Sequence, residues 1–118
     1  MKMNLLPNYE LAVIPYDKFI RYSLDPDSIR GANKARVYQS ALGFNLSNAE
    51  LLIEQIRQKL PAYEAVSQLP GEYGNRYTVD IPITGVNGKT ELVRTAWQID
   101  YGKTIPHLVS NYVLLRRR

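Results

Sequence analysis

Hydrophobic residues change their spacing about halfway along the chain. Up to about residue 60 they recur every three or four positions, which is the spacing of amphipathic helices. From residue 75 onward they alternate with polar residues within β-branched and aromatic runs, which is typical of strands. This order predicts an α+β fold, with about three N-terminal helices packed on a C-terminal antiparallel sheet of three to four strands.

The first two predicted helices are bounded by proline and glycine. The first follows Pro15 and ends before Pro26, because proline is tolerated in a first helical turn, whereas the residue before a proline avoids the α region. The second runs from about Asn33 to Leu42, and Gly43 stands where a C-terminal cap is expected.

The third predicted helix has the strongest local start signal in the sequence. "SNAE" at residues 47–50 matches a capping box, in which Ser47 accepts a hydrogen bond from a backbone amide and Glu50 reaches back. Pro61 ends this helix.

The second half of the chain contains a predicted hairpin and two further strands. Residues 75–85 and 90–100 flank Asn87-Gly88, which predicts a two-residue type I′ turn because both central positions need a positive φ. Residues 105–115 form a further predicted strand, and residues 63–69 are a candidate for a fourth.

The hairpin turn fixes which residues of the two strands share a face. A two-residue loop puts Asp80 opposite Thr95, and side chains alternate between faces. The face expected to meet the helices carries Tyr77, Val79, Ile81, Ile83, Leu92, Arg94 and Ala96. The other face is mixed and is either a ligand-binding surface or an ordinary solvated one; it carries Thr78, Asp80, Thr84, Val93, Thr95, Trp97 and Ile99. Pro82 indicates a sheet edge or a bulge, and a bulge shifts this register.

Arg94 is the charged residue on the face expected to meet the helices. An unpaired buried guanidinium is energetically costly. We therefore expect Arg94 to pair with a carboxylate from a helix, to lie near the end of the sheet, or to point into a cleft as a substrate-binding residue.

Composition narrows the classes of function. A length of 118 residues fits one domain, residues 1–118, with a core that needs neither metal nor disulfides. The chain has no cysteine, His107 is its only histidine, and it has no phosphate-binding glycine motif, so we expect no metal and no cofactor. It also has no apolar run long enough for a signal peptide or a membrane span, so a soluble cytoplasmic protein without membrane association is expected.

The positive charge is a weak argument for a nucleic-acid partner. The formal net charge is +4, but Arg116, Arg117 and Arg118 supply most of it as a C-terminal tail. Charge informs on association and not on fold, and a basic tail is usually solvated.

The residue types that remain suit metal-independent acid–base chemistry. Cleavage of RNA by transesterification needs a base, an acid and cations that stabilise the phosphorane. His107, Ser110 and Tyr112 belong to one predicted strand and are candidates for proton transfer, with Ser110 and Tyr112 on the same face. A surface histidine and a half-buried strand tyrosine are the ordinary alternatives for His107 and Tyr112.

Lys34 and Arg36 begin the second predicted helix directly after Gly31, which permits a tight entry. A cation in a first helical turn opposes the helix dipole, so Lys34 is expected either to meet a phosphate at the end of the sheet or to lie in an ordinary solvated turn.

Two long segments, "GANKARVYQSALGFNLSNAELLIEQI" and "EYGNRYTVDIPITGVNGKTELVRTAWQI", resemble an uncharacterised bacterial domain family. That family occurs as short standalone proteins and as C-terminal domains of polymorphic toxins. The resemblance covers nearly the whole chain, with the patterns G-x-x-K-A and Y-G-x-x-Y-x-x-D. The matching residues are Gly31, Lys34, Ala35, Tyr73, Gly74, Tyr77, Asp80, Val93, Trp97, Pro106, Leu108 and Tyr112. The chain departs from the family at Val109 and Ser110, where relatives tend toward a threonine pair.

The resemblance implies a toxin-type domain whose order of elements is similar to the barnase/EndoU/RelE-like ribonuclease superfamily. A domain of this type would act as a metal-independent endoribonuclease, which is a hydrolase that binds RNA. A cognate antitoxin or immunity protein would neutralise it. Together with the residue chemistry above, this resemblance gives His107, Ser110, Tyr112 and Lys34 as the candidate catalytic residues, and Arg94, Arg36, Trp97, Thr95 and Asp80 as the candidate substrate-binding residues. The alternative is a non-catalytic interaction module, either an antitoxin-like partner or a degenerate toxin. The sequence leaves the oligomeric state open.

Overall fold

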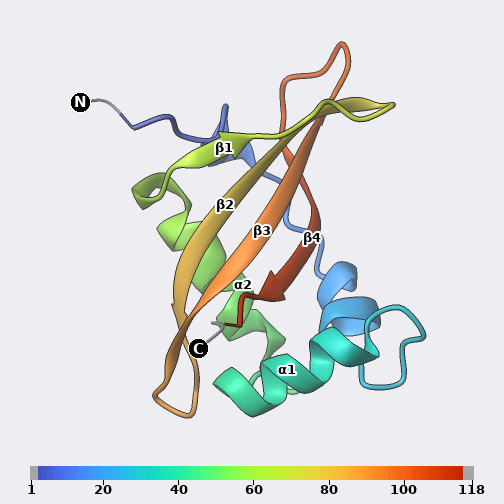
Figure 1. Cartoon of the computed structure of the whole chain (residues 1–118), viewed down its shortest axis with the longest axis vertical. Helices are drawn as coiled ribbons and strands as arrows, with labels where there is room; N and C mark the ends of the chain where they lie inside the picture. Colours follow the sequence, from blue (N-terminus) through green and yellow to red (C-terminus); the bar gives the residue numbers. More distant parts are fainter. Residues whose placement is uncertain (1–2, 116–118) are drawn as a thin grey trace.

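The computed structural model describes residues 3–115 as a four-stranded antiparallel sheet with helices packed against it (Figure 1). The elements in chain order are η1 (Tyr9–Leu11), η2 (Phe19–Ser23), α1 (Ala32–Leu42), α2 (Ala49–Lys59), η3 (Leu60–Ala62), β1 (Ala65–Ser67), β2 (Gly74–Thr84), β3 (Thr90–Asp100) and β4 (His107–Val113). The strand order is β1-β2-β3-β4, so each strand pairs with the next one in the sequence. The predicted α+β fold is confirmed. The basic tail at 116–118 lies outside the described residues.

The core lies between the helices and one face of the sheet. Apolar residues at helical spacing on the inner faces of α1 and α2 are fully buried, as are the inward positions of β2 from residue 79 to 83. They are Tyr38, Leu42, Leu52, Ile56, Val79, Ile81 and Ile83. Burying each large apolar side chain contributes about 1.5–3 kcal/mol, so this layer is the main source of stability.

The hairpin loop between β2 and β3 is longer than predicted. Pairing ends where Thr84 lies opposite Thr90, which leaves residues 85–89 as the loop. The Asn87 side chain donates a hydrogen bond of 3.1 Å to the carbonyl oxygen of Ala41 in α1. The loop therefore rests on the end of α1, and this tertiary contact accompanies a loop longer than an Asn-Gly turn.

The longer loop shifts the hairpin register by one residue. Asp80 lies opposite Arg94 and not opposite Thr95. The faces of β3 are reversed as a result, so Thr95 and Trp97 point into the core with no exposed surface. The predicted ligand-binding face that included Thr95 and Trp97 is wrong, whereas the inward face of β2 is as predicted.

Pro82 lies at an edge of the sheet, which is one of the two positions that the sequence predicted for it. β1 pairs with β2 only over residues 77–79, so at Pro82 the strand has β3 as its neighbour and the other side is free of strand pairing. Lys59 of α2 donates to the Pro82 carbonyl oxygen at 2.7 Å on that part of β2. The pairing of β2 with β3 is continuous, so the predicted alternative of a bulge there is wrong.

The loop between α1 and α2 differs from the predicted capping box. The helix begins at Ala49, and its N-terminal cap is Asn48, which makes no side-chain capping bond. The Asn48 side chain instead accepts from the Asn45 amide at 2.8 Å and donates to the Gly43 carbonyl oxygen at 3.0 Å. The Asn48 side chain thus bonds to backbone groups of the preceding loop and not to the amides of the first turn of α2. Ser47, the predicted cap, lies one residue before the actual cap.

The first predicted helix is reduced to the short π-helical element η2. It lies between Pro15 and Pro26, as predicted, but covers only Phe19–Ser23. Among the described residues, no helix has both the length and the apolar character needed to span a membrane.

A bulge in β4 decides which of its side chains face the core. Ala96 pairs with Ser110 while Trp97 pairs with Leu108, so Val109 is an extra residue in β4. Leu108 and Asn111 are consequently both buried. Bulges re-aim side chains next to binding sites in many proteins.

The substitution Gly85→Ala tests the docked hairpin loop. A Cβ atom at Gly85 would lie 2.1 Å from the carbonyl oxygen of Leu42, so α1 or the loop must move. We expect the free energy of unfolding, measured by urea denaturation, to fall by about 3 kcal/mol. This is the upper end of the usual cost of overpacking, because the obstructing atom belongs to the backbone and cannot turn aside.

Gly88→Ala is the matched variant, because Gly88 has a φ of 84° and open space around its Cα. We expect it to cost about 1 kcal/mol through backbone strain alone. In a hairpin with a two-residue turn at Asn87-Gly88, Gly88→Ala would lower the free energy of unfolding more than Gly85→Ala. A larger loss for Gly88→Ala therefore contradicts the docked loop.

Candidate functional site

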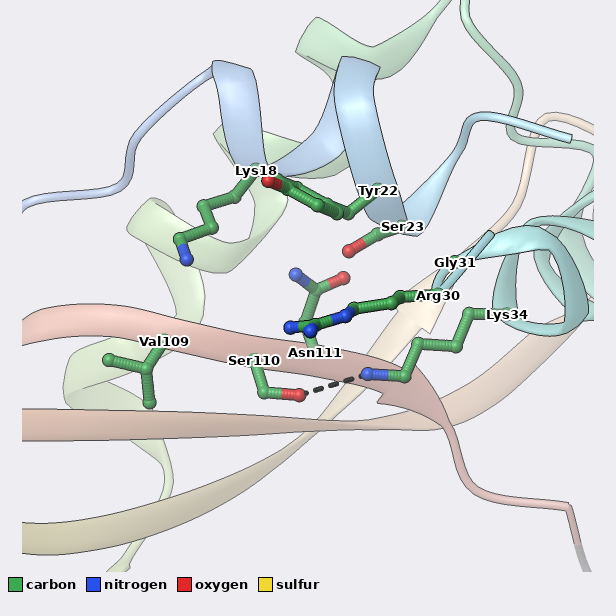
Figure 2. A pocket seen from close by; sticks show the side chains of 9 residues that line it. All are labelled: Lys18, Tyr22, Ser23, Arg30, Gly31, Lys34, Val109, Ser110 and Asn111. Carbon is green, nitrogen blue, oxygen red and sulfur yellow. Dashed lines mark hydrogen bonds between the residues drawn. The ribbon is translucent and has the colours of Figure 1, made fainter. Parts of the chain in front are cut away.

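A pocket of about 220 Å³ opens beside β4 (Figure 2). Its walls come from η2, the segment that leads into α1, the first turn of α1 and the middle of β4. The lining residues are Lys18, Tyr22, Ser23, Arg30, Gly31, Lys34, Val109, Ser110 and Asn111. Three of these side chains are cations and none is a carboxylate, so the pocket has a positive potential.

A close backbone contact brings the walls of this pocket together. A Cβ atom on Gly31 would lie 1.9 Å from the carbonyl oxygen of Tyr22. The segment before α1 therefore passes directly against η2, which is an approach that glycine permits. This contact places Arg30 and Lys34 across the pocket from Lys18.

Lys34 connects α1 to β4 at the pocket wall. Its Nζ atom donates to the Ser110 hydroxyl at 3.1 Å and lies 5.5 Å from the centroid of the Tyr112 ring. Ser110 and Tyr112 pair with Ala96 and Arg94, so they share a face of β4, as predicted. The structure thus brings together three of the four predicted catalytic residues.

Asn111 forms the buried floor of the pocket. It is 1% exposed, and its Oδ1 atom accepts a hydrogen bond of 2.7 Å from the hydroxyl of Tyr38 in α1. Burial raises the pKa of Tyr38 well above its usual range, so the phenol keeps its proton and donates. Asn111 Nδ2 is buried and has no hydrogen-bond partner among the described residues.

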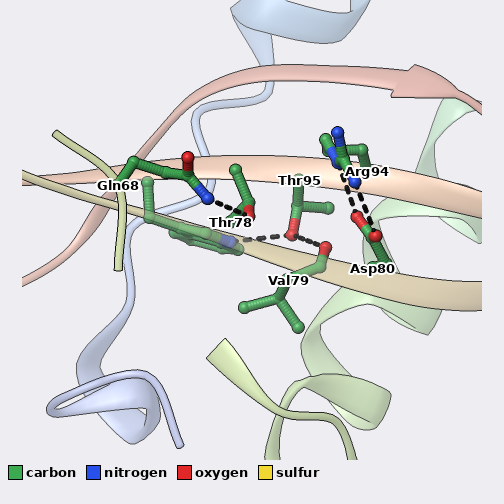
Figure 3. A network of polar contacts seen from close by, with 7 residues as sticks. Gln68, Thr78, Val79, Asp80, Arg94 and Thr95 are labelled. Atoms are coloured by element: carbon green, nitrogen blue, oxygen red, sulfur yellow. Dashed lines mark hydrogen bonds and ion pairs between the residues drawn. The ribbon is translucent and has the colours of Figure 1, made fainter. Parts of the chain in front are cut away.

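Arg94 forms an ion pair with Asp80 on the sheet face away from the core (Figure 3). Its Nε atom lies 2.8 Å from Oδ1, and a second nitrogen lies 2.9 Å from Oδ2. The hydrogen bond to Asp80 raises the pKa of Arg94 above its already high ordinary value, so Arg94 stays charged. Arg94 is paired with a carboxylate, but the predicted partner is wrong, because Asp80 comes from the neighbouring strand and not from a helix, and the pair lies on the outer face of the sheet.

Thr95 and Trp97 form an internal polar network. Thr95 donates to the Val79 carbonyl oxygen at 2.7 Å and accepts from the Trp97 indole at 2.8 Å. Figure 3 shows the Thr95 bond to Val79 beside the Asp80–Arg94 pair. Both side chains are enclosed and satisfied by protein groups, so they hold the hairpin together and are not placed to meet a ligand.

Two other predicted site residues lie away from the pocket. His107 begins β4 and lines a separate hollow with Asp100 and Lys103. Arg36 is exposed on α1, where it bonds to Asn33. Proximity in sequence grouped His107 with Ser110, but an extended strand rises about 3.3 Å per residue and separates them.

The pocket residues that the sequence-based prediction missed include Lys18, Arg30 and Asn111. Arg30 immediately precedes the Gly31 to Lys34 segment, which was a usable signal. Asn111 was hidden by the bulge, because simple alternation does not place it inward. Among residues 3–115, no group of three or more His, Asp or Glu side chains is arranged to hold a metal ion.

The chain belongs to the family described as "Domain of unknown function (DUF6883)", which matches residues 5–115. This agrees with the resemblance to an uncharacterised domain family. A chain in the solved structure of a contact-dependent growth inhibition toxin–immunity protein complex from Klebsiella pneumoniae 342 has a similar fold. Its TM-score is 0.60 at 14% sequence identity, over 86% of this chain and 99% of that chain. Similarity at this level of identity shows the fold alone. No curated protein matches the sequence.

Tyr38→Phe tests the hydrogen bond beneath the pocket. The change leaves the Asn111 Oδ1 atom buried without its donor, so we expect the free energy of unfolding to fall by about 1–3 kcal/mol. Urea denaturation measures the loss. The control is Tyr63→Phe, a half-buried tyrosine packed against the core, which should change stability by less than about 0.5 kcal/mol. Equal effects of the two substitutions contradict a structural role for the Tyr38 hydroxyl.

Proposed function

We propose that this protein is the toxin of a bacterial toxin–immunity pair and that it cleaves RNA without a metal ion. The observation that carries the proposal is the pocket in which Lys34 contacts Ser110 beside Lys18 and Arg30, with no carboxylate in the lining. Such a pocket attracts a phosphodiester. The fold shared with a chain from a toxin–immunity complex supports the biological setting.

The chemistry that suits this pocket is transesterification. The 2′-oxygen of a ribose attacks the adjacent phosphorus, the bond to the 5′-oxygen breaks, and a 2′,3′-cyclic phosphate forms. Lys34 and Arg30 stabilise the negative charge that builds up on the phosphorane. The 2′-hydroxyl passes its proton to a non-bridging phosphate oxygen as it attacks, and the Ser110 hydroxyl, which Lys34 holds in place, orients that phosphate. Tyr112, whose ring lies beside Lys34, donates its proton to the departing 5′-oxygen and is reprotonated from the cyclic phosphate.

Of the other predicted site residues, Arg94 and Asp80 take a supporting part in this proposal and His107 takes none. The Arg94 guanidinium is already paired with Asp80, and Arg94 lies opposite Tyr112 in the sheet. We assign this ion pair to holding the surroundings of Tyr112 rather than to gripping phosphate. His107 lines a different hollow and is left outside the reaction.

A second candidate function is the immunity or antitoxin-like side of such a pair. The observation in its favour is the sheet face away from the core, which no helix covers in Figure 1. That face and its border expose Val66 and Leu69, with 54% and 90% of their surfaces accessible. Exposed apolar side chains of this kind suit binding to a partner protein.

Cleavage of total RNA in the presence of EDTA tests the enzymatic proposal. We expect purified protein to give discrete fragments on a denaturing gel. Lys34→Met should lower the rate by about 100-fold or more, because it removes a charge that stabilises the transition state. Arg36→Met is the matched control, since it removes a cation from the same helix outside the pocket, and it should cleave like the wild type.

The result that contradicts the proposal is intact RNA in the presence of folded wild-type protein. Equal cleavage by the Lys34→Met and wild-type proteins contradicts the assigned site instead.

Growth of a bacterial host separates the two candidate functions. We expect induced expression to arrest growth, and we expect Tyr112→Phe and Lys34→Met to relieve the arrest, because the Tyr112 ring lies beside Lys34. His107→Gln should remain toxic, because His107 lines a separate hollow with Asp100 and Lys103. Normal growth with well-expressed wild-type protein contradicts the toxin and favours the immunity-like function, and relief by His107→Gln contradicts the placement of the site.

A further inference from the structure

We infer that the pocket beside β4 is a binding site for the phosphate group of a nucleotide, with the Asn111 side-chain amide as its deepest donor and Tyr38 as the residue that positions this amide. The inference deepens the proposed function because it concerns the same pocket. Binding of phosphate does not require that RNA be cleaved, so the two proposals can fail separately.

The first argument is the state of the Asn111 amide. Its Nδ2 group is buried and lacks a hydrogen-bond partner among the described residues. Buried polar groups in native proteins are almost always satisfied, so an orphaned donor on a pocket floor indicates a missing acceptor. Its neighbours Lys18, Arg30 and Lys34 are themselves donors when charged, and they cannot accept its proton.

The second argument is the orientation of that amide. An asparagine can present either its oxygen or its nitrogen to a given neighbour. The buried Tyr38 phenol keeps its proton and donates to Oδ1 at 2.7 Å. The nitrogen is therefore turned away from Tyr38. Figure 2 shows the Asn111 amide between Ser23 and the guanidinium of Arg30.

The third argument is the charge of the lining. Among residues 3–115, the side chains that form an ion pair are Arg94 and Asp80. Lys18, Arg30 and Lys34 therefore have no carboxylate partner within the described residues. Lys18 reaches the pocket from the start of η2, Arg30 from the segment before α1 and Lys34 from α1, while Asn111 reaches it from β4. A phosphate group offers acceptor oxygens in several directions and a charge that matches these donors.

A carboxylate ligand fits this lining less well than a phosphate. It offers two oxygens in one plane and a single charge, whereas the donors of the pocket come from four separate segments. A metal cation or a neutral donor finds few acceptors here, because the Lys34 ammonium already uses the Ser110 hydroxyl as an acceptor.

Titration of isotope-labelled protein with inorganic phosphate and with a nucleoside 3′-monophosphate tests the inference by NMR. We expect the side-chain amide signals of Asn111 to shift and to saturate with both ligands, with tighter binding of the nucleotide. Unmoved Asn111 signals overturn the site. Saturable binding of inorganic phosphate without binding of the nucleotide overturns the assignment to nucleic acid.

Matched variants test the roles of Asn111 and Tyr38. Asn111→Asp replaces the donor by a like-sized acceptor and should weaken phosphate binding by about tenfold or more. Asn75→Asp makes the same change of charge at an exposed position of β2 and should bind like the wild type. Tyr38→Phe keeps every charge but frees the amide to turn, so it should weaken binding several-fold. Equal affinity of the Asn111→Asp and Asn75→Asp proteins overturns the inference.

The same proteins separate this inference from the proposed function. RNA cleavage that is lost in Lys34→Met but unchanged in Asn111→Asp supports the enzyme and overturns the Asn111 site. Phosphate binding that depends on Asn111, in a protein that leaves RNA intact, supports the site and contradicts the enzyme. The titration of the wild type needs no variant, so a failure of Asn111→Asp to fold leaves the inference testable.

Discussion

The hydrogen bond between the Tyr38 hydroxyl and Asn111 ties α1 to β4 beneath the candidate site. One turn earlier on α1, Lys34 reaches the Ser110 hydroxyl on the same strand. A small rotation of α1 about its axis would break both contacts together. The position of the cation over the strand therefore depends on a buried, fully protonated phenol that packs in the core.

A second constraint holds the opposite wall of the pocket in place. Gly31 passes so close to the Tyr22 carbonyl oxygen that no side chain fits between them. Arg30 immediately precedes Gly31, so the same contact fixes where its side chain enters the pocket. The cations of the pocket repel one another, and the packing of α1 and η2 against β4 must offset that repulsion. A bound anion would remove it.

Local patterns of the sequence were enough to predict the order of helices and strands, because periodicity depends on neighbouring residues alone. The register of β3 was not predictable in this way, since the contact of Asn87 with the Ala41 carbonyl oxygen accompanies a longer loop. The site was found in part. Lys34 was chosen from its place in the sequence and lies in the pocket, whereas Asn111 was missed because the extra residue Val109 reverses the alternation of β4.

The most direct test of the central claim is a crystal structure of the protein grown with a nucleoside 3′-monophosphate. The account predicts phosphate density in the pocket beside β4, with oxygens about 2.7–3.2 Å from Asn111 Nδ2 and Lys34 Nζ. Phosphate bound in the hollow beside His107, or on the open face of the sheet, with the Asn111 amide left without a phosphate contact, would contradict it.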